Sequence, residues 1–155
     1  MDEPGQGVSP PVAAFFATVG FAALAICGFG FTSLFTGQDV LATPGLGHAP
    51  GITAMILAGV TFAATEWTAT RRGRYPAAGW VTLATTAAYA GGIVLGGLLG
   101  GIDPARTVSA AGAFLLSWFA LVLVLAAFVA AWSGVALVRT RAGRPEWPWE
   151  RDEDE

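Results

Sequence analysis

The sequence predicts an all-α integral membrane protein, a bundle of four transmembrane helices with both termini in the cytoplasm. Of its 155 residues, 54% are hydrophobic and only 12% are charged, which is too apolar for a soluble domain of this size. Four apolar segments each approach or exceed the roughly 20 residues that cross a bilayer as a helix. The arginines gather at alternate ends of these segments, as the positive-inside rule requires of a multi-pass protein.

The four predicted spans form one transmembrane domain over residues 12–138. The last of them is longer than a bilayer needs, and we expect tilt or an extra turn to absorb the excess. The spans cover residues 12–35, 51–70, 77–99 and 109–138.

The two ends of the chain are predicted to be cytoplasmic tails, residues 1–11 and 139–155. A cleaved signal peptide is not expected at the N-terminus, because Asp2 and Glu3 stand where a signal peptide is basic. The first apolar stretch is also too long for a signal peptide. We therefore expect the first span to remain as a helix.

The orientation rests on the arginines, since the chain contains no lysine. Three arginines lie between the second and third spans and four follow the last span, whereas Arg106 alone lies in the other two loops. Five of the six tryptophans lie near the same predicted ends, Trp118 being the exception. Tryptophan favours the headgroup level, so both patterns indicate a plasma-membrane protein with its termini inside.

Small residues recur at every fourth position of the third span. This spacing lets a second helix backbone approach closely, so van der Waals contacts and weak Cα hydrogen bonds can form. The third span is therefore the predicted packing centre, although alanine and glycine are abundant throughout the chain. The last span carries a similar row at Ala126, Ala130 and Gly134. The row on the third span is Ala84, Ala88, Gly92, Gly96 and Gly100.

Glu66 is the only formally charged residue within the predicted spans. Ionisable residues inside a membrane span are candidates for function. Glu66 shares a helical face with Gly59, Ala63 and Thr70, so we expect it to face another helix and not lipid. A carboxylate in that position could bind a proton or a cation.

A second interpretation makes Glu66 an anchor near the cytoplasmic surface. At about 1.5 Å per residue it lies about 7 Å along the helix from Arg71. From there its side chain could reach the interface or pair with Arg71, Arg72 or Arg139. Both interpretations stay open on the sequence.

The sequence offers no convergent set of reactive groups. Cys27 is the only cysteine and His48 the only histidine, so neither an intramolecular disulfide nor a histidine pair can form. Asp39 and Asp103 are the only other acids in the predicted outer loops, which is too few ligands for a metal site. We expect no enzymatic activity, cofactor, metal or nucleic-acid partner.

The C-terminal stretch RPEWPWERDEDE combines prolines, tryptophans and acids. Pro145 and Pro148 prevent a continuous helix, and the acidic end should turn toward water. Trp147 and Trp149 then lie along the interface, either as an anchor or as a docking site for a partner protein.

Two stretches carry a resemblance to a known group of proteins. AICGFGFTSLFTGQDVLA at residues 25–42 and RPEWPWE at residues 144–150, together with the four-helix layout, resemble an uncharacterised family of small actinobacterial membrane proteins. The resemblance implies an integral plasma-membrane protein, and it supplies no activity and no site residue.

Two functional hypotheses follow. The first is an accessory or scaffolding protein that uses small-residue faces or the tryptophan tail to associate with itself or with another membrane protein. The alternative is a small transporter or channel component in which Glu66 binds a proton or a cation. In both, the lipid bilayer is the surrounding partner.

Overall fold

The computed structural model describes residues 8–41, 43–72 and 75–139, and this part of the chain is helical with no strand. Four of the helices are long and apolar enough to cross a membrane, which confirms the predicted class; they are α1, α2, α3 and α5. The helices are α1 (Pro10–Thr36), α2 (Ala49–Arg72), α3 (Pro76–Leu99), α4 (Pro104–Leu115) and α5 (Trp118–Arg139).

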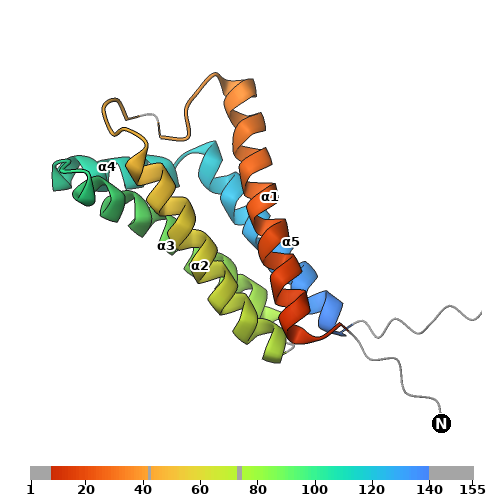
Figure 1. Ribbon diagram of the computed structural model, residues 1–155. Helices are drawn as coiled ribbons and strands as arrows, with labels where there is room; N and C mark the ends of the chain where they lie inside the picture. Colours follow the sequence, from red (N-terminus) through yellow and green to blue (C-terminus); the bar gives the residue numbers. More distant parts are fainter. Residues whose placement is uncertain (1–7, 42, 73–74, 140–155) are drawn as a thin grey trace, which may run out of the picture.

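The long helices pack as two pairs. α2 lies along α3 and α1 lies along α5, whereas the backbones of α1 and α3 stay apart. The pairs meet where α1 begins and α5 ends, and they diverge toward the loop of residues 37–48 (Figure 1). Gly37 ends α1 in the left-handed conformation, with φ of 63°, and its N–H donates to the Ser33 carbonyl. The loop can therefore turn away directly at the end of α1.

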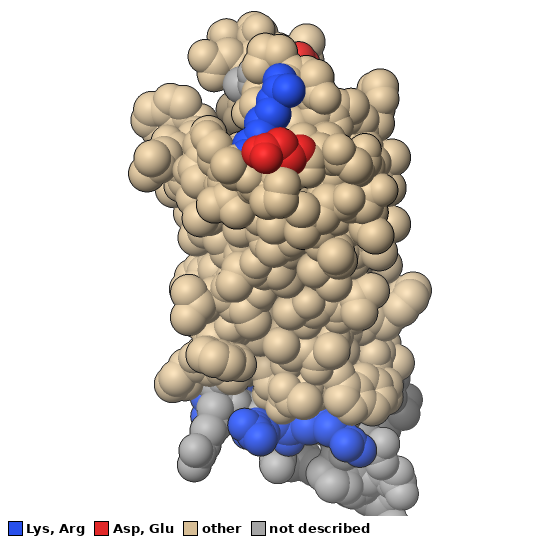
Figure 2. All heavy atoms as spheres, turned by 90° about the vertical axis from the view of Figure 1, so that its left-hand side faces the viewer, with Lys and Arg blue, Asp and Glu red and all other residues tan. Residues whose placement is uncertain are grey.

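Charged side chains gather at the two ends of the described molecule, and an uncharged belt separates them (Figure 2). Arg71 and Arg72 end α2 and Arg139 ends α5, so these three lie at one end. Asp103 and Arg106 lie at the start of α4, at the other end. Large apolar side chains such as Phe16 are exposed on the belt, as expected for a surface that faces lipid.

The predicted continuous helix over residues 109–138 is wrong. α4 ends at Leu115 and α5 begins at Trp118, so the chain turns between them. The Ser117 hydroxyl and the Ser117 N–H both donate to the Phe114 carbonyl, at 2.6 Å and 2.9 Å. Such local bonds from a short polar side chain compete with the regular helical ladder. The excess length therefore belongs to a separate helix.

α4 also begins earlier than predicted. The Asp103 carboxylate accepts a hydrogen bond from the Ala105 N–H at 3.2 Å, and Pro104 occupies the first helical position. This is a standard helix start, because proline lacks the N–H that would be unpaired there. α4 then packs on α3 where a Cβ at Gly97 would overlap the Thr107 methyl group.

We expect Asp103→Ala to lower the free energy of unfolding by about 1 kcal/mol, the usual cost of removing an N-cap side chain. Thermal unfolding of the detergent-solubilised protein measures the change. Ser109→Ala, at an exposed position on the same helix, is the matched control. Equal stability of the two variants would contradict a capping role for Asp103.

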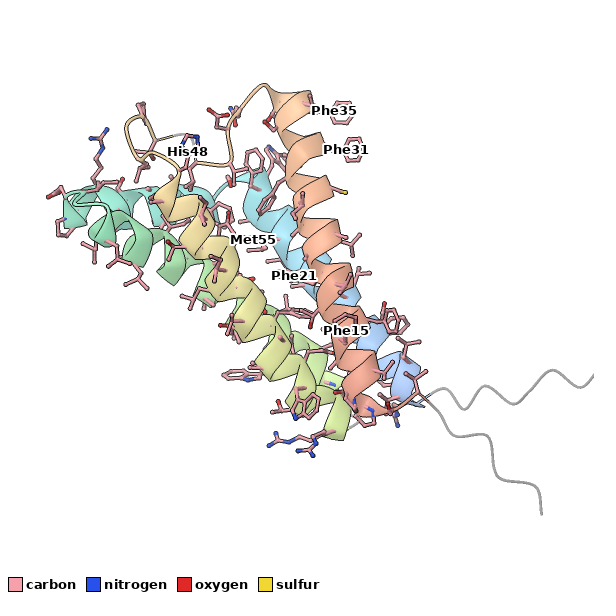
Figure 3. All side chains as sticks on the ribbon, in the orientation of Figure 1. Phe15, Phe21, Phe31, Phe35, His48 and Met55 are labelled. Atoms are coloured by element: carbon pink, nitrogen blue, oxygen red, sulfur yellow. The ribbon has the colours of Figure 1, made fainter. Side chains whose placement is uncertain are left out.

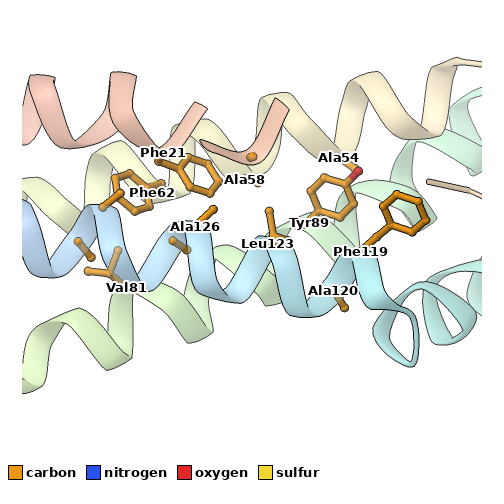
Figure 4. Close-up of a cluster of buried hydrophobic side chains, with 14 of the residues drawn as sticks. Phe21, Ala54, Ala58, Phe62, Val81, Tyr89, Phe119, Ala120, Leu123 and Ala126 are labelled. Carbon is orange, nitrogen blue, oxygen red and sulfur yellow. The ribbon is translucent and has the colours of Figure 1, made fainter. Parts of the chain in front are cut away.

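Buried aromatic side chains lie among alanine, valine and leucine side chains in the interior of the bundle (Figure 4). Phe21 of α1 and Phe62 of α2 stack with ring centroids 4.5 Å apart and an interplanar angle of 8°. Nearer the loop, Tyr89 stacks on Phe114 at 4.6 Å, and Phe29 meets Tyr89 edge-on at 5.8 Å. Stacked and edge-on pairs of this kind stabilise beyond their buried area.

Candidate functional site

Glu66 belongs to a row of buried residues on α2. The row follows the four-residue spacing that places side chains above one another on one helical face. Glu66 itself is 0% exposed, so its side chain points into the bundle and not toward lipid. The row is Ala54, Ala58, Phe62, Glu66 and Thr70.

The carboxyl group of Glu66 is enclosed by α1 and α5. A Cβ at Gly134 of α5 would overlap Glu66 Oε1 and would lie 2.9 Å from the Ala17 Cβ of α1. The carboxyl therefore occupies the space that a side chain at position 134 would need. The glycine allows three helices to close around one acidic group.

Neither carboxyl oxygen of Glu66 has a hydrogen-bond partner in the described part of the chain, and both are buried. Thr70 lies one turn away, but its hydroxyl donates to the Glu66 main-chain carbonyl at 2.9 Å and not to the carboxyl. A buried polar group without a partner is costly. Packing alone therefore does not explain why a glutamate occupies position 66.

Arg71 in the last turn of α2 and Arg139 in the last turn of α5 contact aromatic rings instead. The Arg71 guanidinium lies 5.3 Å from the centroid of the Trp67 ring, and that of Arg139 lies 4.7 Å from the centroid of the Tyr75 ring. No described arginine, Arg72 included, bonds to the Glu66 carboxyl. The pairing expected of an anchor is thus absent from residues 8–41, 43–72 and 75–139.

The surroundings of Glu66 suit a proton better than a metal ion. Calcium and magnesium take six or more oxygen ligands, or retain several waters, and the described residues contain no cluster of three potential metal ligands. An unpaired charge is expensive in a span, whereas a neutral protonated carboxyl is less so. What the described residues offer at this position is a single buried carboxyl group that can hold a proton.

A second feature is an open cleft of about 620 Å³ between α1 and α2, beneath the 37–48 loop. Arg106 of α4 donates to the Pro44 carbonyl, which fastens this loop to α4. His48 and Met55 lie at the loop and the upper part of α2 (Figure 3). The walls are mainly apolar, with Asp39, His48 and Tyr89 as polar members; the apolar side chains are Ile26, Phe29, Val40, Leu41, Ile52 and Met55.

The small residues of α3 are used in different ways. A Cβ at Gly92 would overlap the Ala54 Cα, and one at Gly96 would lie 2.7 Å from the Pro50 Cα. These two glycines therefore lie directly against the backbone of α2. Ala84 and Ala88 are half-buried and Gly100 is exposed. On α5, Ala126, Ala130 and Gly134 are buried.

The predicted docking residues Trp147 and Trp149 lie outside the described residues. Sequence reasoning also missed the cleft and the Phe21–Phe62 stack. The stack had no distinguishing signal, because both residues lie in uninterrupted apolar runs. The spacing of Phe62 and Glu66 by four residues was the one available hint that they share a face.

The length and apolar composition of four helices among the described residues indicate a multi-pass membrane protein. The chain belongs to DUF6121, a family of unknown function, whose profile matches residues 10–155. This confirms the resemblance to an uncharacterised family. Neither the curated proteins nor the solved structures contain a match to the chain.

Proposed function

We propose that this protein is a proton-binding component of a small membrane transporter or channel, with Glu66 as the proton site. The observation that carries the proposal is a carboxyl group that is 0% exposed, enclosed by three helices and without a hydrogen-bond partner among the described residues. Ionisable groups buried in a span are costly and commonly serve proton or ion pathways.

The proposal places the arginine-rich end in the cytoplasm, following the positive-inside rule, and the chain in the plasma membrane. Glu66 precedes Arg71 by five residues, so it lies about 7 Å along the helix from that end. Exchange of protons with the cytoplasm is then the shorter of the two routes. We assign no catalytic reaction to the chain.

The accessory or scaffolding hypothesis remains a prediction. Gly92, Gly96 and Gly134 contact helices of the same chain, so these small residues are already engaged within the protein. Association would then have to use the tail with Trp147 and Trp149 or the exposed apolar faces. Nothing in the described residues favours one partner for those surfaces.

Reconstitution into liposomes that contain a pH-sensitive dye tests the proposal. An imposed pH gradient or membrane potential should drive proton entry with the unaltered protein. Glu66→Gln keeps the size of the side chain but cannot carry a proton, so proton entry should fall to the level of protein-free liposomes.

Thr68→Ala is the matched control, because Thr68 is exposed on the same helix, and it should leave proton entry unchanged. Size-exclusion chromatography establishes that each variant is folded. Equal proton entry through the unaltered protein and Glu66→Gln would eliminate Glu66 as the proton site.

A further inference from the structure

The cleft and Glu66 lie on the same side of α2, in line along the helix. Met55 lines the cleft, and Ala58, Phe62 and Glu66 follow it on the buried row. Glu66 follows Met55 by eleven positions, which is about 16 Å of helix. What fills this interval decides whether the cleft communicates with the carboxyl.

The interval is closed by aromatic rings. Phe62 lies one turn from Glu66, and the Phe21 ring of α1 stacks on it with a centroid distance of 4.5 Å. Both phenylalanines are 0% exposed, as is Leu123 of α5. We call the pair Phe21 and Phe62 the Phe barrier.

α1 repeats the order seen on α2. Ile26 and Phe29 line the cleft, Phe21 forms its half of the barrier, and Ala17 lies beside Gly134 and the Glu66 carboxyl. Along both helices, counted from the loop side, the residues that line the cleft come first, a phenylalanine of the Phe barrier follows, and the residue at the Glu66 carboxyl comes last. This agreement makes the α1–α2 seam the direct line between the two sites.

We propose that the α1–α2 cleft is the port through which water and protons approach Glu66 from the loop side, and that the Phe barrier closes this route. The inference rests on the proposed function and adds the route and its control. Dry hydrophobic constrictions exclude water and ions without blocking the pore by charge. Asp39 and His48 are polar side chains in the lining of this otherwise mainly apolar cleft.

The two halves of the barrier stand on different helix pairs. Phe21 belongs to the pair α1 and α5, whereas Phe62 belongs to the pair α2 and α3. These pairs diverge toward the loop of residues 37–48 (Figure 1), which contributes to the lining of the cleft. A rocking movement of one pair against the other separates the rings and extends the cleft toward Glu66, which is a common way for membrane transporters to change access.

Thiol labelling tests the route without any assay of proton movement. Cys27 is replaced by alanine, so that Glu66→Cys provides the only thiol. A membrane-impermeant thiol reagent is applied to the loop side of the membrane. The labelling rate at position 66 should be low with the barrier intact, and it should rise about tenfold or more with Phe62→Ala or Phe21→Ala, because a stacked aromatic contact is lost.

Two controls accompany the labelling. Met55→Cys in the cleft should react at a similar rate whether or not Phe62 is replaced. Because this thiol lies on the loop side, its labelling also shows whether intact cells or everted vesicles expose that side to the reagent. Phe16→Ala removes an aromatic ring that is 60% exposed on the belt, and it should leave labelling at position 66 unchanged.

The outcomes separate the route from the proton site. The route is overturned if the thiol at position 66 reacts equally with and without the Phe barrier. It is also overturned if that thiol stays unreactive from the loop side in both barrier variants while Met55→Cys reacts. Gated labelling without proton entry in liposomes would uphold the route and refute the proton function. Glu66-dependent proton entry without gated labelling would uphold the proton function and refute the route.

Discussion

Replacing Glu66 with methionine should stabilise the protein while removing its proton site. Methionine has a similar length and no polar atom that needs a hydrogen bond. The unaltered carboxyl has two buried oxygens without a partner among the described residues, and leaving such a group unpaired costs about 1–3 kcal/mol. We expect the free energy of unfolding to rise by an amount in that range.

Thermal unfolding in mild detergent, read by near-UV circular dichroism, measures this gain. Glu66→Gln is the informative comparison, because its amide remains an unpartnered polar group and should give little or none of the stabilisation. A lower unfolding temperature for Glu66→Met would mean that the carboxyl supports the fold, as an anchor would. Stability gained together with activity lost is the usual sign of a residue kept for function.

Gly92→Ala should destabilise the protein strongly. A Cβ at this position would overlap the Ala54 Cα and would lie 3.0 Å from the Ala54 nitrogen. The atoms in the way are backbone atoms, which cannot rotate aside, so α2 and α3 must separate. Overpacking of this kind costs about 1–3 kcal/mol, and we expect a loss at the upper end.

The neighbouring glycine provides the control. Gly91→Ala adds the same methyl group on the same helix, yet a Cβ there meets nothing within 4 Å. Alanine is the better helix former by up to about 1 kcal/mol, so this variant should be neutral or slightly stabilised. Similar unfolding temperatures for Gly91→Ala and Gly92→Ala would show that close contact between α2 and α3 is not what the glycine provides.

Much of the fold could be predicted because bilayer thickness dictates the length of an apolar helix. The break before α5 could not, since residues 109–138 read as one apolar run. Its cause is a local hydrogen bond, which the Ser117 hydroxyl donates to the Phe114 carbonyl. The start of α4 was predictable, because Asp103 followed by Pro104 is a typical helix start. The turn-forming residues around this pair favoured a loop instead.

The candidate site could be predicted only in part. Periodicity indicated that Glu66 faces the bundle, and the structure places it there, 0% exposed. Its depth along the helix also left pairing with Arg71 open, because a long side chain can reach the interface. The contact with Gly134 depends on how α2 and α5 meet, and a single sequence does not encode which residues on different helices oppose one another.

The contact between Gly134 and Glu66 also has an evolutionary consequence. The carboxyl of Glu66 occupies the volume into which a side chain at position 134 would extend, so the two positions share one fixed space. Among relatives, a larger residue aligned with Gly134 should therefore be accompanied by a shorter one aligned with Glu66. Residues other than glycine should occur at the position of Gly134 mainly in relatives that have no acidic residue at the position of Glu66.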